Sequence, residues 1–145
     1  MVDVPPEVAI KATIRPGSVY YFTEESFSST EPHYFVVLNT DPLKDRTVIF
    51  VCASSKIEKV KRRRPHCPSE TLVIISPVQY AVFKCETIID CNTVFEKPVE
   101  LLVEKLTQGK LQLKDEMAQN RVSKLREGVI ASPLIEGYIK ELLMG

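Results

Sequence analysis

The sequence has no tryptophan, only five glycines and no low-complexity stretch among its 145 residues. Apolar residues make up 44% of the chain and charged residues 26%, which excludes both a collagen-like and an intrinsically disordered protein. The length lies within the range of one domain with a core of its own. We therefore expect a single folded domain over residues 1–145.

Long hydrophobic runs are also absent. Apolar stretches such as residues 36–38 and 72–75 are far shorter than the roughly 18 residues of a membrane-spanning helix. Residues 1–7 lack the basic region and apolar run that mark a secretory signal. We expect a cytoplasmic protein that does not enter the membrane.

Neither sign of charge is in excess, because nineteen Lys and Arg balance nineteen Asp and Glu. This balance excludes a globally basic nucleic-acid-binding protein, so any such binding must be local. The four cysteines include no CxxC pair, and we expect free thiols. A zinc site made of His66, Cys67, Cys85 and Cys91 is a minor alternative, because its spacing does not fit paired knuckles. We expect neither a metal nor a cofactor.

Several catalytic signatures are missing as well. The sequence contains no GxSxG, HExxH, phosphate-loop or dinucleotide-binding pattern. Serine hydrolases, zinc proteases, NTPases and classical dehydrogenases therefore lack their required parts here.

The first 95 residues have the pattern of β-strands. Five short runs rich in β-branched and aromatic residues are separated by turn-forming residues, and they cover residues 19–22, 34–38, 48–52, 72–75 and 87–89. No helix-length pattern separates these runs, which favours antiparallel neighbours over parallel βαβ units. We expect a small β-barrel over residues 15–95.

From Pro98 onward, apolar residues recur at helical spacing. The pattern predicts a helix from Pro98 to Gly109, a second with an apolar stripe over residues 118–129, and a third that follows Ser132. We expect this helical extension, residues 96–145, to pack on the barrel, and a groove for a partner peptide is the alternative. The expected fold class is α+β, mainly β with C-terminal helices.

The strongest local feature is a run of cations at residues 56–66, where a single carboxylate accompanies six basic side chains, namely Lys56, Lys59, Lys61, Arg62, Arg63 and Arg64. This concentration of charge predicts an anionic partner. The alternative is a solvated loop between strands, paired with acids such as Glu24, Glu25 and Glu31.

Two further groups could take part in chemistry. Ser54 and Ser55 lie where a strand ends, and their hydroxyls could hydrogen-bond a phosphate or cap a turn. His33 opens a strand, and an imidazole titrates near neutral pH, which suits acid or base catalysis. A structural role is the alternative for each.

The order of these segments resembles the PemK/MazF-like family of toxin endoribonucleases. Residues 15–22, 32–39 and 48–55 are similar to the first three strands of that family, and residues 87–95 precede a helix as they do there. The resemblance spans roughly residues 15–108. It implies an SH3-like barrel, a homodimer that binds single-stranded RNA in a groove, and an antitoxin protein as partner.

The resemblance also implies metal-independent cleavage, in which a ribose 2′-hydroxyl attacks the adjacent phosphate. Ser54 or Ser55 matches the position of a family Thr or Ser, whereas Pro32 and His33 stand where the family carries an Arg. We expect His33, Ser54, Ser55 and Arg15 to be catalytic and the cations between Lys56 and Arg64 to bind RNA. The alternative is a non-catalytic module that binds RNA or protein.

Overall fold

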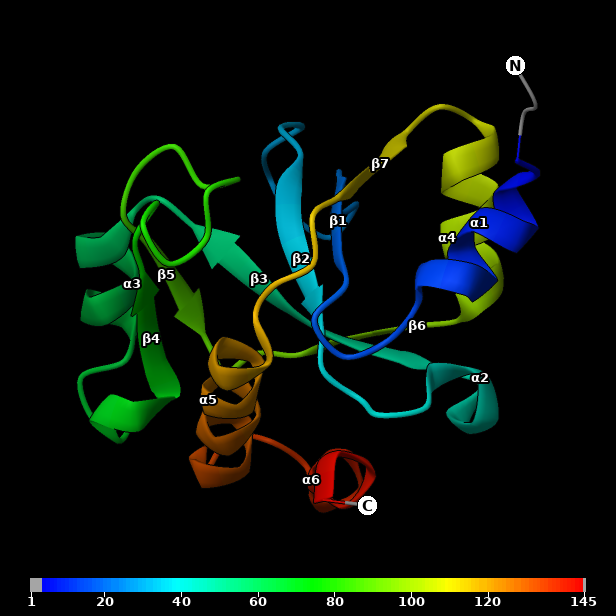
Figure 1. Cartoon of the computed structure of the whole chain (residues 1–145). Helices are drawn as coiled ribbons and strands as arrows, with labels where there is room; N and C mark the ends of the chain where they lie inside the picture. The colour runs from blue at the N-terminus through cyan, green and yellow to red at the C-terminus, as the bar shows by residue number, and fades with distance from the viewer. Residues whose placement is uncertain (1–3, 145) are drawn as a thin grey trace.

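The computed structural model describes residues 4–144 of the protein, and its elements are drawn in Figure 1. The strands of this part are β1 (Val19–Phe22), β2 (His33–Val37), β3 (Val48–Ser54), β4 (Leu72–Ile75), β5 (Thr87–Asp90), β6 (Phe95–Lys97) and β7 (Leu111–Lys114). The helices are α1 (Pro6–Thr13), α2 (Pro42–Asp45), α3 (Ile57–Arg63), α4 (Val99–Thr107), α5 (Gln119–Ala131) and α6 (Gly137–Met144), with a 3₁₀ helix η1 (Ser69–Thr71).

All strands belong to one sheet in the order β4-β5-β3-β2-β1-β7, and every neighbouring pair is antiparallel. β6 lies off this path and pairs with the first half of β3, where Phe50 is opposite Phe95. Within residues 4–144, no pairing joins β4 to β7, so the sheet is open. The fold is therefore α+β, as expected, and a closed barrel is not seen.

Successive side chains of the central strands point alternately into two separate hydrophobic cores. Tyr20, Phe35 and Phe50 face one core, which α1 and α4 cover, whereas Val36 and Val51 face the other, which α5 and α6 cover. Figure 1 shows α1 packed beside α4 at one side of the sheet, far from α5 and α6. Because β3 is covered on both faces, its residues from Val48 to Val51 are all buried.

The five expected strands are confirmed within a residue or two, and the three expected helices correspond to α4, α5 and α6. The extension after residue 96 is nevertheless not purely helical, contrary to expectation. β7 interrupts it and pairs with β1, with Gln112 opposite Tyr21. β6 pairs with β3. The sheet therefore continues into the segment that was expected to be helical. β7 could not be predicted because four residues offer too little apolar periodicity to identify a strand.

Candidate nucleic-acid interface

Most of the cation run forms helix α3, so the alternative of a solvated loop between strands is wrong in its local structure. Lys, Arg and Glu are good helix formers, and basic residues in the last turn face the negative end of the helix dipole. Val60 is buried against the sheet, and Ile57, one turn earlier, is half-buried on the same side. α3 thus begins only three residues after β3 ends and points its cations outward.

Five of the six basic side chains are free on the surface. Within residues 4–144, the ion pairs involve other cations, and none includes these exposed residues, which are Lys56, Lys59, Lys61, Arg62 and Arg63. Of the three acids considered above as their partners, two lie against other cations, and Glu31 forms no ion pair among the described residues. Glu24 pairs with Lys97 at 3.0 Å, and Glu25 lies 3.8 Å from Lys105. The positive charge of α3 is therefore available to an external anion.

Arg64 is the exception among the six. Its Nε donates to Asp90 Oδ2 at 3.0 Å and its Nη2 donates to Thr93 Oγ1 at 2.9 Å. Only 23% of this side chain is exposed. Arg64 therefore ties the end of α3 to the segment after β5, and its expected place among the RNA contacts is not supported by the geometry.

A buried polar network surrounds this ion pair. It could not be predicted from the sequence, where the only indication is the polar segment from Asp90 to Thr93 at the end of a strand. Asn92 Nδ2 donates to Thr71 Oγ1 and to Asp90 Oδ1, both at 2.9 Å. Ser132 Oγ donates to Asn92 Oδ1 at 2.6 Å. Because every member has a partner, the network joins η1, β5 and the end of α5 without leaving a buried polar group unpaired.

His33 opens β2 and packs edge-to-face on Phe27, with ring centroids 5.0 Å apart. Its Nδ1 lies 3.1 Å from the carbonyl oxygen of Glu31, which can only accept a hydrogen bond. Nδ1 is therefore the donor in this contact, and in the neutral ring the lone pair lies on Nε2. Within the described residues, no group hydrogen-bonds to Nε2. The basic nitrogen of the neutral ring thus has no partner within the fold among the described residues.

Ser54 ends β3, and its Oγ accepts a hydrogen bond from the backbone N–H of Lys56 at 3.1 Å, which starts the turn into α3. Strand alternation places Ser54 and His33 on the same face of the sheet as Phe35 and Phe50. Their strands separate before they reach one another, because β3 leaves β2 after Cys52 and joins β5 at Ala53. Figure 1 shows this divergence.

Ser55 and Arg15 occupy different surroundings. Ser55 is exposed in the turn before α3. Arg15 precedes β1, and its Nε and Nη2 donate to the two carboxylate oxygens of Glu116 at 2.7 and 3.1 Å. His33 pairs with Phe22 at the far end of β1, about 10 Å along the strand. The structure therefore does not bring Arg15 to the other candidate catalytic residues.

The four cysteines differ in exposure, since Cys91 is buried, Cys52 and Cys67 are half-buried and Cys85 is exposed. All four are free thiols. Burial, with a smaller effect of the Glu24 charge, raises the pKa of Cys52 to about 12. Burial together with the Asp90 charge raises the pKa of Cys91 to about 12. Across residues 4–144, no three His, Cys, Asp or Glu side chains gather in a way that could hold a metal ion, so the four residues of the zinc alternative do not form one site.

No protein-family model matches this chain, and no curated protein matches it in sequence. The resemblance to the PemK/MazF-like family therefore rests on the residues quoted above. Within the described part of the chain, no helix is long and apolar enough to span a membrane.

Proposed function

We propose that this protein binds single-stranded RNA through α3, as a toxin-type endoribonuclease of the PemK/MazF-like kind. The observation that carries this proposal is the set of five exposed, unpaired cations on and beside one short helix of a chain with no net charge. Cations in such an arrangement neutralise successive phosphates and release the counterions bound to them. Flexible single strands can follow a small convex surface of this kind more closely than a stiff duplex can.

The test compares two triple variants with the same change in charge. Lys61→Gln, Arg62→Gln and Arg63→Gln remove three cations of α3, and Lys44→Gln, Lys110→Gln and Lys124→Gln remove three exposed cations elsewhere. Binding of a fluorescent single-stranded RNA is measured by anisotropy between about 50 and 200 mM salt. The α3 variant should bind more weakly and its log–log salt slope should fall by about 2, whereas the control keeps the wild-type slope. Equal losses in the two variants would exclude α3 as the site.

The cleavage step of this proposal is supported by the hydrogen bonding of the His33 ring, which occupies Nδ1. Its free Nε2 can take the proton of a ribose 2′-hydroxyl, so that the 2′-oxygen attacks the neighbouring phosphorus. The bond to the 5′-oxygen then breaks and this oxygen takes up a proton from water, which leaves a 2′,3′-cyclic phosphate on one fragment and a 5′-hydroxyl on the other. The cations of α3 would stabilise the extra negative charge on the phosphate. Along the chain, Ser54 and Ser55 lie between His33 and the cations of α3, and their hydroxyls could hydrogen-bond the phosphate.

Cleavage is tested with a long single-stranded RNA in excess EDTA. The wild type is compared with His33→Ala, with Ser54→Ala/Ser55→Ala and with His66→Ala, which removes the other histidine of the chain. We expect fragments with cyclic phosphate ends from the wild type and His66→Ala, and intact RNA from His33→Ala despite normal binding. Intact RNA from a wild type that binds it would instead establish the alternative, a binding module without catalysis.

The resemblance adds an SH3-like barrel, a homodimer, an antitoxin partner and a cytoplasmic location to this proposal. The antiparallel order of β1, β2 and β3, and the way β3 passes from one part of the sheet to the other, support the barrel relationship. Sedimentation of the purified chain tests the dimer, and co-purification of a protein encoded beside it tests the antitoxin.

A further inference from the structure

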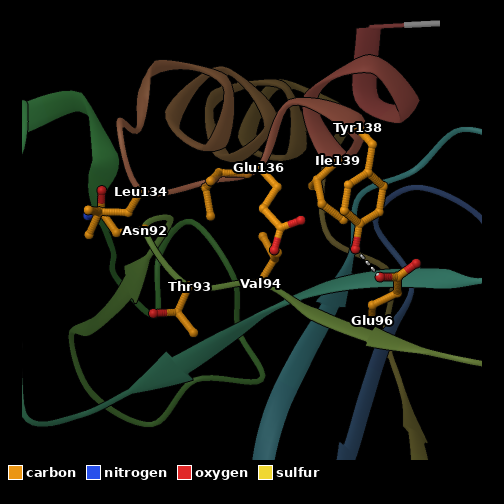
Figure 2. Close-up of a pocket in the computed structure, with 9 residues that line it drawn as sticks. Asn92, Thr93, Val94, Glu96, Leu134, Glu136, Tyr138 and Ile139 are labelled. Carbon is orange, nitrogen blue, oxygen red and sulfur yellow. Dashed lines mark hydrogen bonds between the residues drawn. The ribbon is translucent and has the colours of Figure 1, made fainter.

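A second surface lies away from the cations, between the segment that follows β5 and the start of α6. Figure 2 shows an open pocket there, with Glu96 and Tyr138 at one end and Glu136 directed into it. Its volume is about 270 Å³. Val94, Leu134 and Ile139 provide its apolar lining.

The pocket carries the negative charge of two exposed carboxylates, Glu96 and Glu136. Glu96 Oε1 accepts a hydrogen bond from the Tyr138 hydroxyl at 2.6 Å. In the described part of the chain, neither Glu96 nor Glu136 takes part in an ion pair. The pKa of Tyr138 rises to about 12, first because of its hydrogen bond to Glu96 and then through loss of solvent and the charges of Glu96 and Glu136. Both carboxylates line the same small pocket.

Apolar surface is exposed at the same place. Leu134 is 55% exposed and Tyr138 is 48% exposed, which is high for large hydrophobic side chains, and both line the pocket. Exposed apolar groups beside unpaired carboxylates match a ligand that has an apolar stem and a cationic end.

We propose that this pocket binds an arginine side chain of a protein partner. A guanidinium group can donate to both carboxylates with its planar fork and lie against the Tyr138 ring, while its methylene groups contact Leu134 and Val94. An RNA phosphate is repelled by the two carboxylates, so this surface is distinct from α3. The inference goes beyond the proposed function and does not depend on it.

The test uses N-acetyl-arginine amide as the probe, and its binding to the intact chain is followed by ¹H–¹⁵N NMR. The amide signals of Val94, Glu136 and Tyr138 should shift in a saturable way. Glu96→Gln/Glu136→Gln should weaken this binding about tenfold, because both charge-assisted hydrogen bonds are lost while the shape is kept. The control Glu127→Gln/Glu141→Gln removes two exposed carboxylates of α5 and α6 outside the pocket and should bind as the wild type does.

Four results would overturn the proposal. They are the absence of saturable shifts, equal shifts with the neutral N-acetyl-citrulline amide, shifts of the same signals by RNA, and shifts that grow with protein concentration alone, which would indicate a second copy in the pocket. Each of these experiments is read out independently of RNA cleavage, so a failure here and a failure of the proposed function are distinguishable.

Discussion

At the scale of single residues, Arg64 differs from its basic neighbours because its charge is already paired within the fold. Removing it with Arg64→Ala leaves the Asp90 carboxylate, of which only 10% is exposed, without its cation. We expect the free energy of unfolding to fall by about 2 kcal/mol, less than for a fully buried pair because part of Arg64 reaches solvent. Urea unfolding measures this loss. Arg63→Ala, an exposed neighbour without an ion pair, should change stability by less than about 0.5 kcal/mol.

The variants Arg63→Ala and Arg64→Ala also distinguish a residue that contacts RNA from one that only stabilises the fold. Arg63→Ala should lower the salt slope of RNA binding, whereas Arg64→Ala should keep it as long as the protein is folded. A normal stability of Arg64→Ala together with a reduced slope would instead return Arg64 to the RNA-binding surface.

Glu24 predicts a pH dependence of stability. Burial raises the pKa of its carboxyl, but hydrogen bonds from Lys97 and Ser26, together with the Lys97 charge, outweigh this effect and hold the pKa below its ordinary value. A lowered pKa means stability that is present above about pH 4.3 and lost as pH falls through the pKa of the folded state. Between about pH 5 and pH 3, the wild type should therefore lose more stability in urea unfolding than Glu24→Gln does.

The matched control for this effect is Glu31→Gln, since Glu31 is exposed and forms no ion pair among the described residues. Between about pH 5 and pH 3, Glu31→Gln should lose as much free energy of unfolding as the wild type does. If Glu24→Gln also loses as much free energy of unfolding in acid as the wild type, the Glu24–Lys97 pair makes no net contribution to folding.

At the scale of elements, the sequence identifies the strands that alternate or run apolar, because both core faces of β2 and β3 need β-branched and aromatic residues. It does not indicate the helix α3, because the segment has six cations and only two apolar residues that face the sheet, which is too few for a helical pattern. It also overlooks β7, whose Gln112 and Lys114 are polar because that strand lies at an edge of the sheet. Among the candidate site residues, the concentration of cations after β3 is visible in the sequence itself. The pairing of Arg15 and Arg64 could not be predicted, because Glu116 and Asp90 are distant in sequence.

Helix α5 lies so close to η1 and β5 that it requires glycine at position 128. A Cβ atom there would meet the carbonyl oxygen of Glu70 at 2.8 Å and the Sγ atom of Cys91 at 2.9 Å. Gly128→Ala should therefore destabilise the fold by about 1–3 kcal/mol in urea unfolding, although alanine favours helix. Gly137→Ala is the control, because a Cβ at that position meets no atom within 4 Å. A gain in stability from Gly128→Ala would show that α5 can move away at no cost.

At the scale of the whole molecule, the balanced composition conceals a separation of charge. Among residues 4–144, the cations of α3 form no ion pair, and neither do the carboxylates Glu96 and Glu136, which share a pocket on another surface. A net charge of zero therefore does not describe either surface, and each can select a ligand of opposite sign. Two partners could occupy the protein at once on these surfaces, one anionic and one basic.

The two cores should unfold together, because neighbouring residues of β3 belong to different ones. Phe50 belongs to the core that contains Leu102 of α4, and Val51 belongs to the core that contains Leu125 of α5. Both leucines are fully buried, so Leu102→Ala and Leu125→Ala should each lower the free energy of unfolding by about 2–5 kcal/mol. Tyrosine fluorescence and far-UV circular dichroism should give coincident urea transitions in both variants, with unchanged slopes. A two-step transition in Leu125→Ala would mean that α5 and α6 form a separate folding unit and that β3 does not couple the two cores.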